Sequence, residues 1–268
     1  DELLAAAADA ANRSGLAVRA LTLVDEALAI PAVADDPVRA GLLHERRGWY
    51  LYRTGRADDA LAAYELAVEL VPAKPPTAAR ARVVQAHAHA LVRAGRAEAA
   101  RPRAEEAVAL ARSVADRVDE GQATHVVGLV LASEGRTDEA IAQLHEAGQI
   151  AAELGDLAEV AGAYVPLWRT LVEAGRGDDL IDLVLGFDTG AAGLASYAPA
   201  PTLMVTIGAA ALHQLGRWDE AEHLLGDGLA AAEVGGLTAI TRTLVAGALA
   251  VDRGDHEQAR DDLEIARA

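Results

Sequence analysis

The chain has 268 residues, of which 52% are hydrophobic but only 3% aromatic, and it contains no cysteine. Its 41 acidic and 24 basic residues give a net charge of −17, which argues against direct nucleic-acid binding by this chain because phosphate backbones are repelled. The lack of cysteine excludes disulfides and thiolate metal sites. The apolar runs are too short or too charged to span a bilayer. We expect a cytoplasmic protein whose helices are built mainly from alanine and leucine.

Seven glycines recur along the chain at intervals of 40, 40, 40, 40, 41 and 38 residues: Gly15, Gly55, Gly95, Gly135, Gly175, Gly216 and Gly254. Arginine and then acidic residues follow most of them, as in GRADDA and GRWDEA. Glycine can adopt the left-handed conformation that ends a helix, and acidic side chains favour the N-terminus of the next one. The pattern therefore predicts seven units, each with two helices joined by a tight turn.

Small residues recur at three fixed places around these glycines. In the second unit Gly48 lies seven residues before Gly55, Ala60 lies five after it, and Ala67 twelve after it. Six of the seven units have a small residue at each of these places. We interpret them as the points at which the two helix backbones of a unit approach most closely.

The second unit, GWYLYRTGRADDALAAYELAVELVP (residues 48–72), resembles the tetratricopeptide repeat (TPR) family. Tyr64 fills the space between its helices, the second helix is expected to begin at Asp58, and Pro72 ends it because a proline ring cannot continue the hydrogen-bond ladder. The resemblance implies an all-α fold, an α-α superhelix of about seven TPR-like repeats with a period near 40 residues. We expect these repeats to form one domain over residues 1–268.

The fifth unit departs from the pattern. Its three small positions hold Trp168, Leu180 and Phe187, and Pro166 lies within its first helix. We predict that Pro166 interrupts this helix, and that an irregular break near residues 176–201 holds a short second helix and a loop over 188–201. Two interpretations remain open, a degenerate repeat that repacks with bulky side chains and a hinge or docking site.

The 40-residue period exceeds the usual TPR length of about 34. We expect the additional residues to lie between one unit's second helix and the next unit's first, with helices of about 14 to 18 residues. Motifs such as EGRTDEAIAQLHEAGQIAAELGD and ALHQLGRWDEAEHLL resemble the helical sensor region of LuxR-type, maltose-activator-like bacterial transcriptional regulators. That resemblance implies an ATP-binding module before this region and a DNA-binding helix-turn-helix after it. We therefore expect the chain to be a fragment of a longer bacterial protein.

Motifs that carry catalysis are missing from the sequence. A phosphate-binding P-loop needs a Gly-Lys-Ser/Thr end, whereas the single lysine, Lys74, lies in VPAKPPT. Neither a Gly-x-Ser-x-Gly nor a His-Glu-x-x-His motif occurs. His87 and His89 are two residues apart on an expected helix and so point to different sides of it. We predict that this segment is not an enzyme and holds no catalytic residue, metal or cofactor.

The first helix of each unit lines the concave groove in TPR-like arrays, as the resemblance implies. Counting back from the turn glycines assigns groove positions in units two to five, where four arginines accompany two glutamates and two histidines. The candidate groove residues are Trp49, Tyr52, Arg53, Arg82, Gln85, His89, Arg93, His125 and Arg169. Guanidinium forks bind carboxylates and aromatic rings add apolar contact, which predicts a protein, a peptide or a small anionic effector as partner. The alternative is that these are ordinary solvated helix faces.

Two functions are compatible with this pattern. The first is a non-catalytic interaction and sensor segment of a larger, signal-responsive transcriptional regulator. The second is a TPR scaffold that mediates protein assembly in another signalling protein. A P-loop module upstream and a helix-turn-helix downstream would favour the first.

Overall fold

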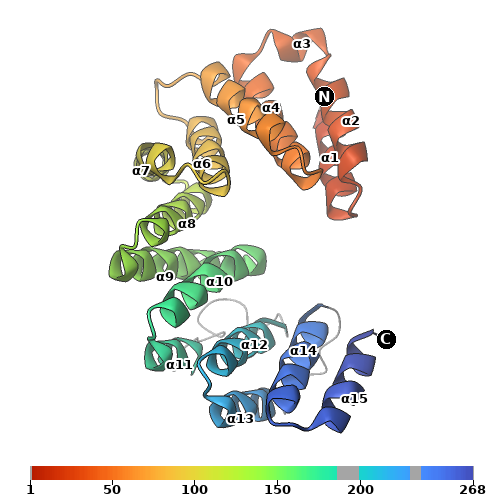
Figure 1. Cartoon of the computed structure of the whole chain (residues 1–268). Helices are drawn as coiled ribbons and strands as arrows, with labels where there is room; N and C mark the ends of the chain where they lie inside the picture. The colour runs from red at the N-terminus through yellow and green to blue at the C-terminus, as the bar shows by residue number, and fades with distance from the viewer. Residues whose placement is uncertain (1, 186–198, 230–236, 268) are drawn as a thin grey trace. The chain divides into compact units, whose positions relative to one another are not determined.

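A computed structural model describes residues 2–185, 199–229 and 237–267 of the chain. Within these ranges the regular elements are all α-helices, α1 to α15, and no strand occurs (Figure 1). This confirms the predicted all-α fold. Two compact units, residues 1–135 and 136–268, are described separately below. The prediction of a single repeat domain over the whole chain stays a prediction.

Unit 1 is a series of helix hairpins in which consecutive helices pack on one another. Its helices are α1 (Glu2–Arg13), α2 (Ala17–Leu28), α3 (Pro31–Ala34), α4 (Pro37–Arg53), α5 (Ala57–Leu70), α6 (Ala78–Arg93), α7 (Ala97–Ser113) and α8 (Arg117–Ser133). The short helix α3 was not predicted, and α5 begins one residue earlier than expected. The first helices α4, α6 and α8 also pack against their neighbours in the series.

Unit 2 continues the same alternation of helices. It consists of α9 (Thr137–Glu153), α10 (Leu157–Glu173), α11 (Gly177–Leu185), α12 (Pro199–Gln214), α13 (Trp218–Leu229), α14 (Leu237–Asp252) and α15 (His256–Arg267). Within it α9 packs on α10, α12 on α13, and α14 on α15.

The seven predicted turn glycines all have a positive φ, between 68° and 81°. In the second repeat the Arg56 N–H donates to the Leu51 carbonyl at 3.0 Å, and the Gly55 N–H donates to the Tyr52 carbonyl at 3.0 Å. This arrangement satisfies two carbonyls that the end of α4 would otherwise leave without partners, and glycine adopts it without a Cβ penalty. The glycine turns are therefore confirmed.

The additional residues of the 40-residue period are mainly helical, and helices α4 to α10 have 14 to 17 residues, within the expected range of about 14 to 18. Helices α7 and α8 each have 17 residues, and so do α9 and α10. Only residues 114–116 separate α7 from α8, and only 154–156 separate α9 from α10. These turns also contain a left-handed residue, Ala115 with φ 55° and Gly155 with φ 70°. Both were missed because one is not a glycine and the other lies outside the seven-glycine series.

The small residues lie at the helix contacts as predicted. A Cβ built on Gly48 would come within 2.9 Å of the Tyr64 ring, and Ala60 and Ala67 are 2% and 0% exposed. Tyr64 belongs to α5, and its buried ring packs against Gly48 of α4. Close packing of this kind leaves no room for larger side chains.

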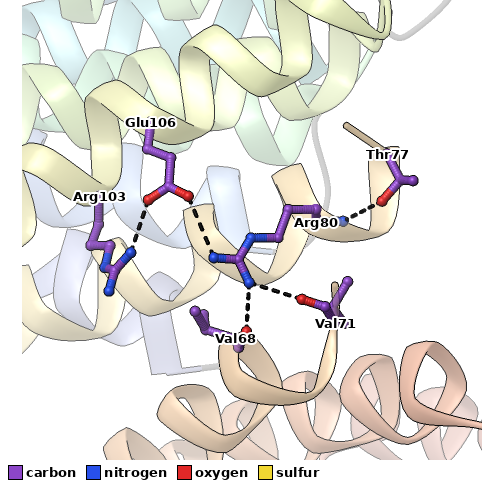
Figure 2. A network of polar contacts seen from close by, with 6 residues as sticks. All are labelled: Val68, Val71, Thr77, Arg80, Arg103 and Glu106. Carbon is purple, nitrogen blue, oxygen red and sulfur yellow. Dashed lines mark hydrogen bonds and ion pairs between the residues drawn. The ribbon is translucent and has the colours of Figure 1, made fainter. Parts of the chain in front are cut away.

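Arg80 joins three helices of unit 1 through its buried guanidinium (Figure 2). Its Nη1 donates to the carbonyls of Val68 at 2.5 Å and Val71 at 2.9 Å, at the C-terminal end of α5. Its Nη2 lies 3.4 Å from Glu106 of α7, which also accepts from Arg103 at 2.9 Å. Helix ends leave carbonyls without partners, so Arg80 caps α5 and fixes its end against α6 and α7.

One prediction for the fifth repeat is wrong, and another is tested only at its last three residues. Helix α10 continues through Pro166 without interruption, and α12 begins at Pro199, inside the segment that was expected to be a loop. The buried side chains of Ala163, Leu167 and Leu171 lie before and after the proline and hold α10 in the core. The expected short second helix is present as α11, with nine residues, and Leu180 is 1% exposed. Phe187 and residues 186–198 lie outside the described residues.

None of the described helices is both long enough and apolar enough to cross a membrane.

Candidate functional site

Three first helices of unit 1 present the predicted groove residues, and polar side chains fix where each helix starts. The Asp36 carboxylate accepts from the N–H groups of Val38 and Arg39 at the start of α4. Thr77 caps α6 and Asp116 caps α8 in the same way. These caps satisfy N–H groups that the first helical turn leaves without partners, so they fix the residue at which each of the three helices begins.

We call the surface built by these helices the α4–α6–α8 face. It comprises Glu45, Trp49, Tyr52, Arg53, Arg82, Gln85, His89, Arg93, Asp119 and His125. All of them belong to unit 1.

An aromatic pair with two guanidinium groups lies at the C-terminal end of α4. The rings of Trp49 and Tyr52 stack with centroids 5.9 Å apart and an interplanar angle of 23°. The Cζ of Arg93, from α6, lies 4.5 Å from the Tyr52 ring centre and 5.3 Å from that of Trp49. The Cζ of Arg53 lies 5.9 Å from the Trp49 ring. Such cation–π contacts orient a guanidinium without neutralising its charge.

Neither Arg53 nor Arg93 forms an ion pair with any residue in the described part of the chain. The Nε of Arg93 is buried and has no hydrogen-bond partner there either. In a chain with many more acids than bases, two neighbouring arginines without an acid are unusual. Their guanidinium forks could bind a carboxylate from another molecule in bidentate fashion.

A pair of neutral histidines lies beside Arg93. His89 of α6 and His125 of α8 meet edge to face with ring centroids 5.6 Å apart. Burial, and the charge of Arg93, lower the pKa of His89 to about 3 and that of His125 to about 4. Both rings are therefore uncharged at neutral pH. The buried Nε2 of His125 has no hydrogen-bond partner in the described structure.

The other end of the face is electrically balanced rather than positive. Arg82 donates to Oε2 of Glu45 through Nε at 3.1 Å and Nη2 at 3.0 Å. Burial raises the pKa of Glu45, although Arg82 opposes the shift. Burial also raises the pKa of Asp119 to about 6, although the positive charge of Arg82 opposes this shift. Arg53 and Arg93 are therefore the arginines of this face whose positive charge is not paired with an acid among the described residues.

The structure brings most of the predicted residues together but not all of them. Trp49, Tyr52, Arg53 and Arg93 form one cluster, with His89 and His125 beside it. Gln85 is only 8% exposed. Arg169 lies on α10 in unit 2, where its Nε is 3.8 Å from Glu173, so it is described with that unit alone. The concave groove itself stays a prediction.

The acidic members of this region were the main omission of the sequence-based prediction. Asp119 was not assigned to the face, and Asp9 of α1 was not considered at all. Asp9 accepts a hydrogen bond of 2.5 Å from the Tyr50 hydroxyl and lies 3.5 Å from Arg46. Glu45 and Arg82 are 37 residues apart, about one helical turn less than the 40-residue period. A shift of one turn per repeat would have placed Asp119 next to Arg82.

The chemistry available here is recognition of a carboxylate and an apolar group. The described residues contain no group of three or more His, Asp or Glu side chains placed to hold a metal ion. The uncharged histidines and the stacked rings offer apolar contact, and Arg93 and Arg53 supply positive charge.

No protein-family model matches the chain, and no curated protein matches it. Several solved structures share its fold at low sequence identity. A Rap protein complexed with competence and sporulation factor aligns with a TM-score of 0.62 and 14% identity, over 98% of this chain and 73% of that one. The Rap conjugation gene regulator of plasmid pLS20, in complex with the Phr* peptide, gives a TM-score of 0.53 and 15% identity over 88% and 66%.

A third structure is a signal-transduction ATPase with numerous domains (STAND) from Pyrococcus horikoshii, which has a tetratricopeptide repeat sensor. It aligns with a TM-score of 0.60 and 15% identity over 98% of this chain and 41% of that one, so this chain spans about two-fifths of its length. Together with the repeat period and the glycine turns, these likenesses show that the chain has a TPR-like helical-repeat fold.

Proposed function

We propose that this chain is a non-catalytic regulatory segment that binds a protein or peptide on the α4–α6–α8 face. The observation that carries the proposal is the position of Arg93, which lies over Tyr52 and Trp49 and forms no ion pair with an acid among the described residues. A carboxylate of the partner would pair with Arg93 and Arg53, and an adjacent apolar side chain would contact the exposed part of Tyr52. Because Tyr52 is 40% exposed, its ring is accessible for such a contact.

The names of the similar structures support a regulatory reading of this surface. One of those proteins is in complex with a peptide, and another carries a TPR sensor. We further propose that the parent of this segment is a cytoplasmic, signal-responsive transcriptional regulator of the LuxR-type. This finer proposal rests on the repeat motifs alone, and the coding sequence on either side of the segment tests it. Flanking regions with neither an ATP-binding module nor a helix-turn-helix would contradict it and favour the assembly scaffold.

A peptide-display selection against the purified chain tests the binding proposal. We expect enrichment of peptides that combine Asp, Glu or a free C-terminal carboxylate with an aromatic or aliphatic side chain. The same selection with the Arg93→Gln variant should lose this enrichment, because the uncharged side chain cannot form the bidentate pair. Arg260→Gln is a matched control, since Arg260 is an exposed arginine of α15 without an acid partner among the described residues. Equal enrichment on all three proteins would contradict the proposal.

A further inference from the structure

A second hollow in unit 1, which the proposed function does not use, lies among α5, α6 and α7. Its volume is about 540 Å³, and Glu65, His87, Leu91, Arg96, Ala99 and Arg103 are among the residues that line it. This volume falls within the usual range of about 300–1,000 Å³ for small-molecule sites. The hollow is lined by both charges and by apolar carbon.

His87 is the first sign that the hollow is built for a ligand. The residue is 8% exposed, yet neither of its ring nitrogens has a hydrogen-bond partner among the described residues. Burial lowers the pKa of His87, and the nearby Glu65 and Arg103 act on it in opposite directions. Both nitrogens have almost no accessible surface, so the neutral ring lines the hollow through its carbon atoms.

Arg96 is the second sign, because it breaks a pattern that the other repeats keep. The arginine after the turn glycine pairs with an acid three residues later in four other units: Arg56 with Asp59, Arg136 with Glu139, Arg176 with Asp179 and Arg217 with Glu220. At the corresponding place after Arg96 stands Ala99. Arg96 has no ion pair with any described residue.

Arg96 also lacks the second partner that two of its counterparts have. Arg176 pairs with Asp138 of the preceding repeat, and Arg217 pairs with Asp178 of the preceding repeat. Asp58 stands 38 residues before Arg96 and does not pair with it. The one repeat in which this arginine lacks both acids is thus the one in which it lines a hollow with an unpartnered buried histidine.

The remaining charges of the hollow define what would fit. Glu106 already binds Arg80 and Arg103, so its carboxylate is not available to a ligand, as Figure 2 shows. Glu65 forms no ion pair with a described residue. The hollow therefore has one unpaired guanidinium, one unpaired carboxylate and a neutral imidazole, with the Leu91 side chain as apolar lining.

We propose that this hollow binds a small zwitterion, a molecule with one carboxylate and one ammonium group such as a free amino acid with an aliphatic side chain. Its carboxylate pairs with Arg96, its ammonium pairs with Glu65, and its aliphatic part lies beside the imidazole of His87 and the Leu91 side chain. This site is separate from the α4–α6–α8 face, so either proposal can fail without the other.

NMR of the His87 ring resonances tests the site, with a His87→Gln variant to assign them. The probes are L-leucine, isocaproate, which lacks the ammonium group, and isoamylamine, which lacks the carboxylate. We expect L-leucine to move the His87 resonances in a saturable way, and each of the two half-ligands to move them far less. No shift with L-leucine would overturn the proposal. A shift as large with isocaproate would overturn the zwitterion assignment in favour of a simple anion site.

An Ala99→Glu variant tests the part played by Arg96. It restores the acid that four other repeats have, so the new carboxylate should pair with Arg96 and abolish the response to L-leucine. Because this residue is in the first turn of α7, an added acid favours the helix and the variant should fold. Ala109→Glu, at an exposed position of the same helix, is the control for added charge and should respond like the parent. An unchanged response of Ala99→Glu would overturn the proposal.

Discussion

Two glycines, Gly48 and Gly148, lie against the ring of a tyrosine on the neighbouring helix. A Cβ on Gly148 of α9 would lie 2.3 Å from Cε2 of Tyr164 on α10, closer than two carbon atoms can approach. Gly162 of α10 has nothing within 4 Å of the same imagined atom. The same residue type therefore serves close packing at one place and has no such role at the other.

This contrast predicts opposite effects of the same substitution. Gly148→Ala should destabilise the chain by about 1–3 kcal/mol, because the added methyl overpacks the contact with Tyr164. Gly162→Ala should stabilise it by about 0.5–1 kcal/mol, because alanine loses less backbone entropy in a helix. Urea denaturation followed by circular dichroism measures both. Two substitutions of equal sign would show that Gly148 does not lie at a tight helix contact.

The buried histidines of the α4–α6–α8 face should make stability depend on pH. In the folded chain the pKa of His125 is about 4, below its unfolded value of about 6.5. The stability it contributes is therefore fully present above pH 6.5 and is lost as the pH falls from there through about 4. Asp119 acts in the opposite sense. Its pKa is raised to about 6 in the folded chain, so the folded chain binds this proton at a higher pH than the unfolded chain, and acidification favours folding at this residue.

Acidification from pH 7 to about pH 4 should lower the free energy of unfolding of the parent. We predict that this loss is about 3 kcal/mol smaller in His125→Gln, at about 1.4 kcal/mol per pKa unit. The measurement is a series of urea titrations from pH 7 to about pH 4, with the parent and variant side by side. His256→Gln, at an exposed position of α15, is the control and should follow the parent. Parallel curves for the parent and His125→Gln would contradict a buried neutral histidine.

At the scale of helices, the Arg80 network determines how α5 ends. Its guanidinium serves two backbone carbonyls and Glu106, and the side chain is only 9% exposed, whereas that of Arg103 in the same network is 40% exposed. Buried charged hydrogen bonds stabilise more than exposed ion pairs, because water cannot replace them.

We therefore predict that Arg80→Gln lowers the free energy of unfolding by about 1.5–3 kcal/mol, the range for a hydrogen bond to a charged group. Arg103→Gln should cost at most about 1 kcal/mol, as for an exposed ion pair. Thermal and urea unfolding of the two variants give the comparison. Similar losses in both would mean that Arg80 does not cap α5.

Local constraints made much of this architecture predictable from sequence. The conformation of Gly55 and the packing of Ala60 and Tyr64 depend on a few neighbouring residues, so the repeat pattern reveals them. Pro166 misled because the cost of an interior proline, about 3 kcal/mol, is a local property. Burial of Leu167 and Leu171 on the same helix outweighs it, and that burial depends on the neighbouring helices.

The candidate face was less predictable for a related reason. The residue types of Trp49, Tyr52 and Arg93 mark a binding surface, and their positions follow from the repeat. The pairing of Arg82 with Glu45 and the burial of Asp119 depend on how far one first helix is shifted along the next. That shift comes from side-chain packing between repeats, which the glycine spacing alone does not define.

At the scale of the repeat array, each unit is stabilised mainly by its neighbours. Helix α11 has nine residues, whereas the second helices α5, α7 and α9 have 14, 17 and 17. We predict that the amides of α11 exchange with solvent faster than those of α9, because a shorter helix buries less surface. Hydrogen exchange with mass spectrometry tests this, and equal protection would show that the shortened helix is no weak point. The expected break near residues 176–201 lies partly outside the described residues.

The central claim is that the TPR-like array binds an acidic partner through Arg53 and Arg93. The most direct test is the affinity of an acidic peptide, taken from the display selection, for the chain and for an Arg53→Gln/Arg93→Gln double variant at increasing salt. Arg96→Gln/Arg260→Gln, two exposed arginines outside the α4–α6–α8 face without acid partners among the described residues, removes the same charge and is the control. We predict that the parent and the control bind alike and more weakly as salt rises, and that the double variant folds but binds far more weakly. Equal binding by the double variant and the control would contradict the claim.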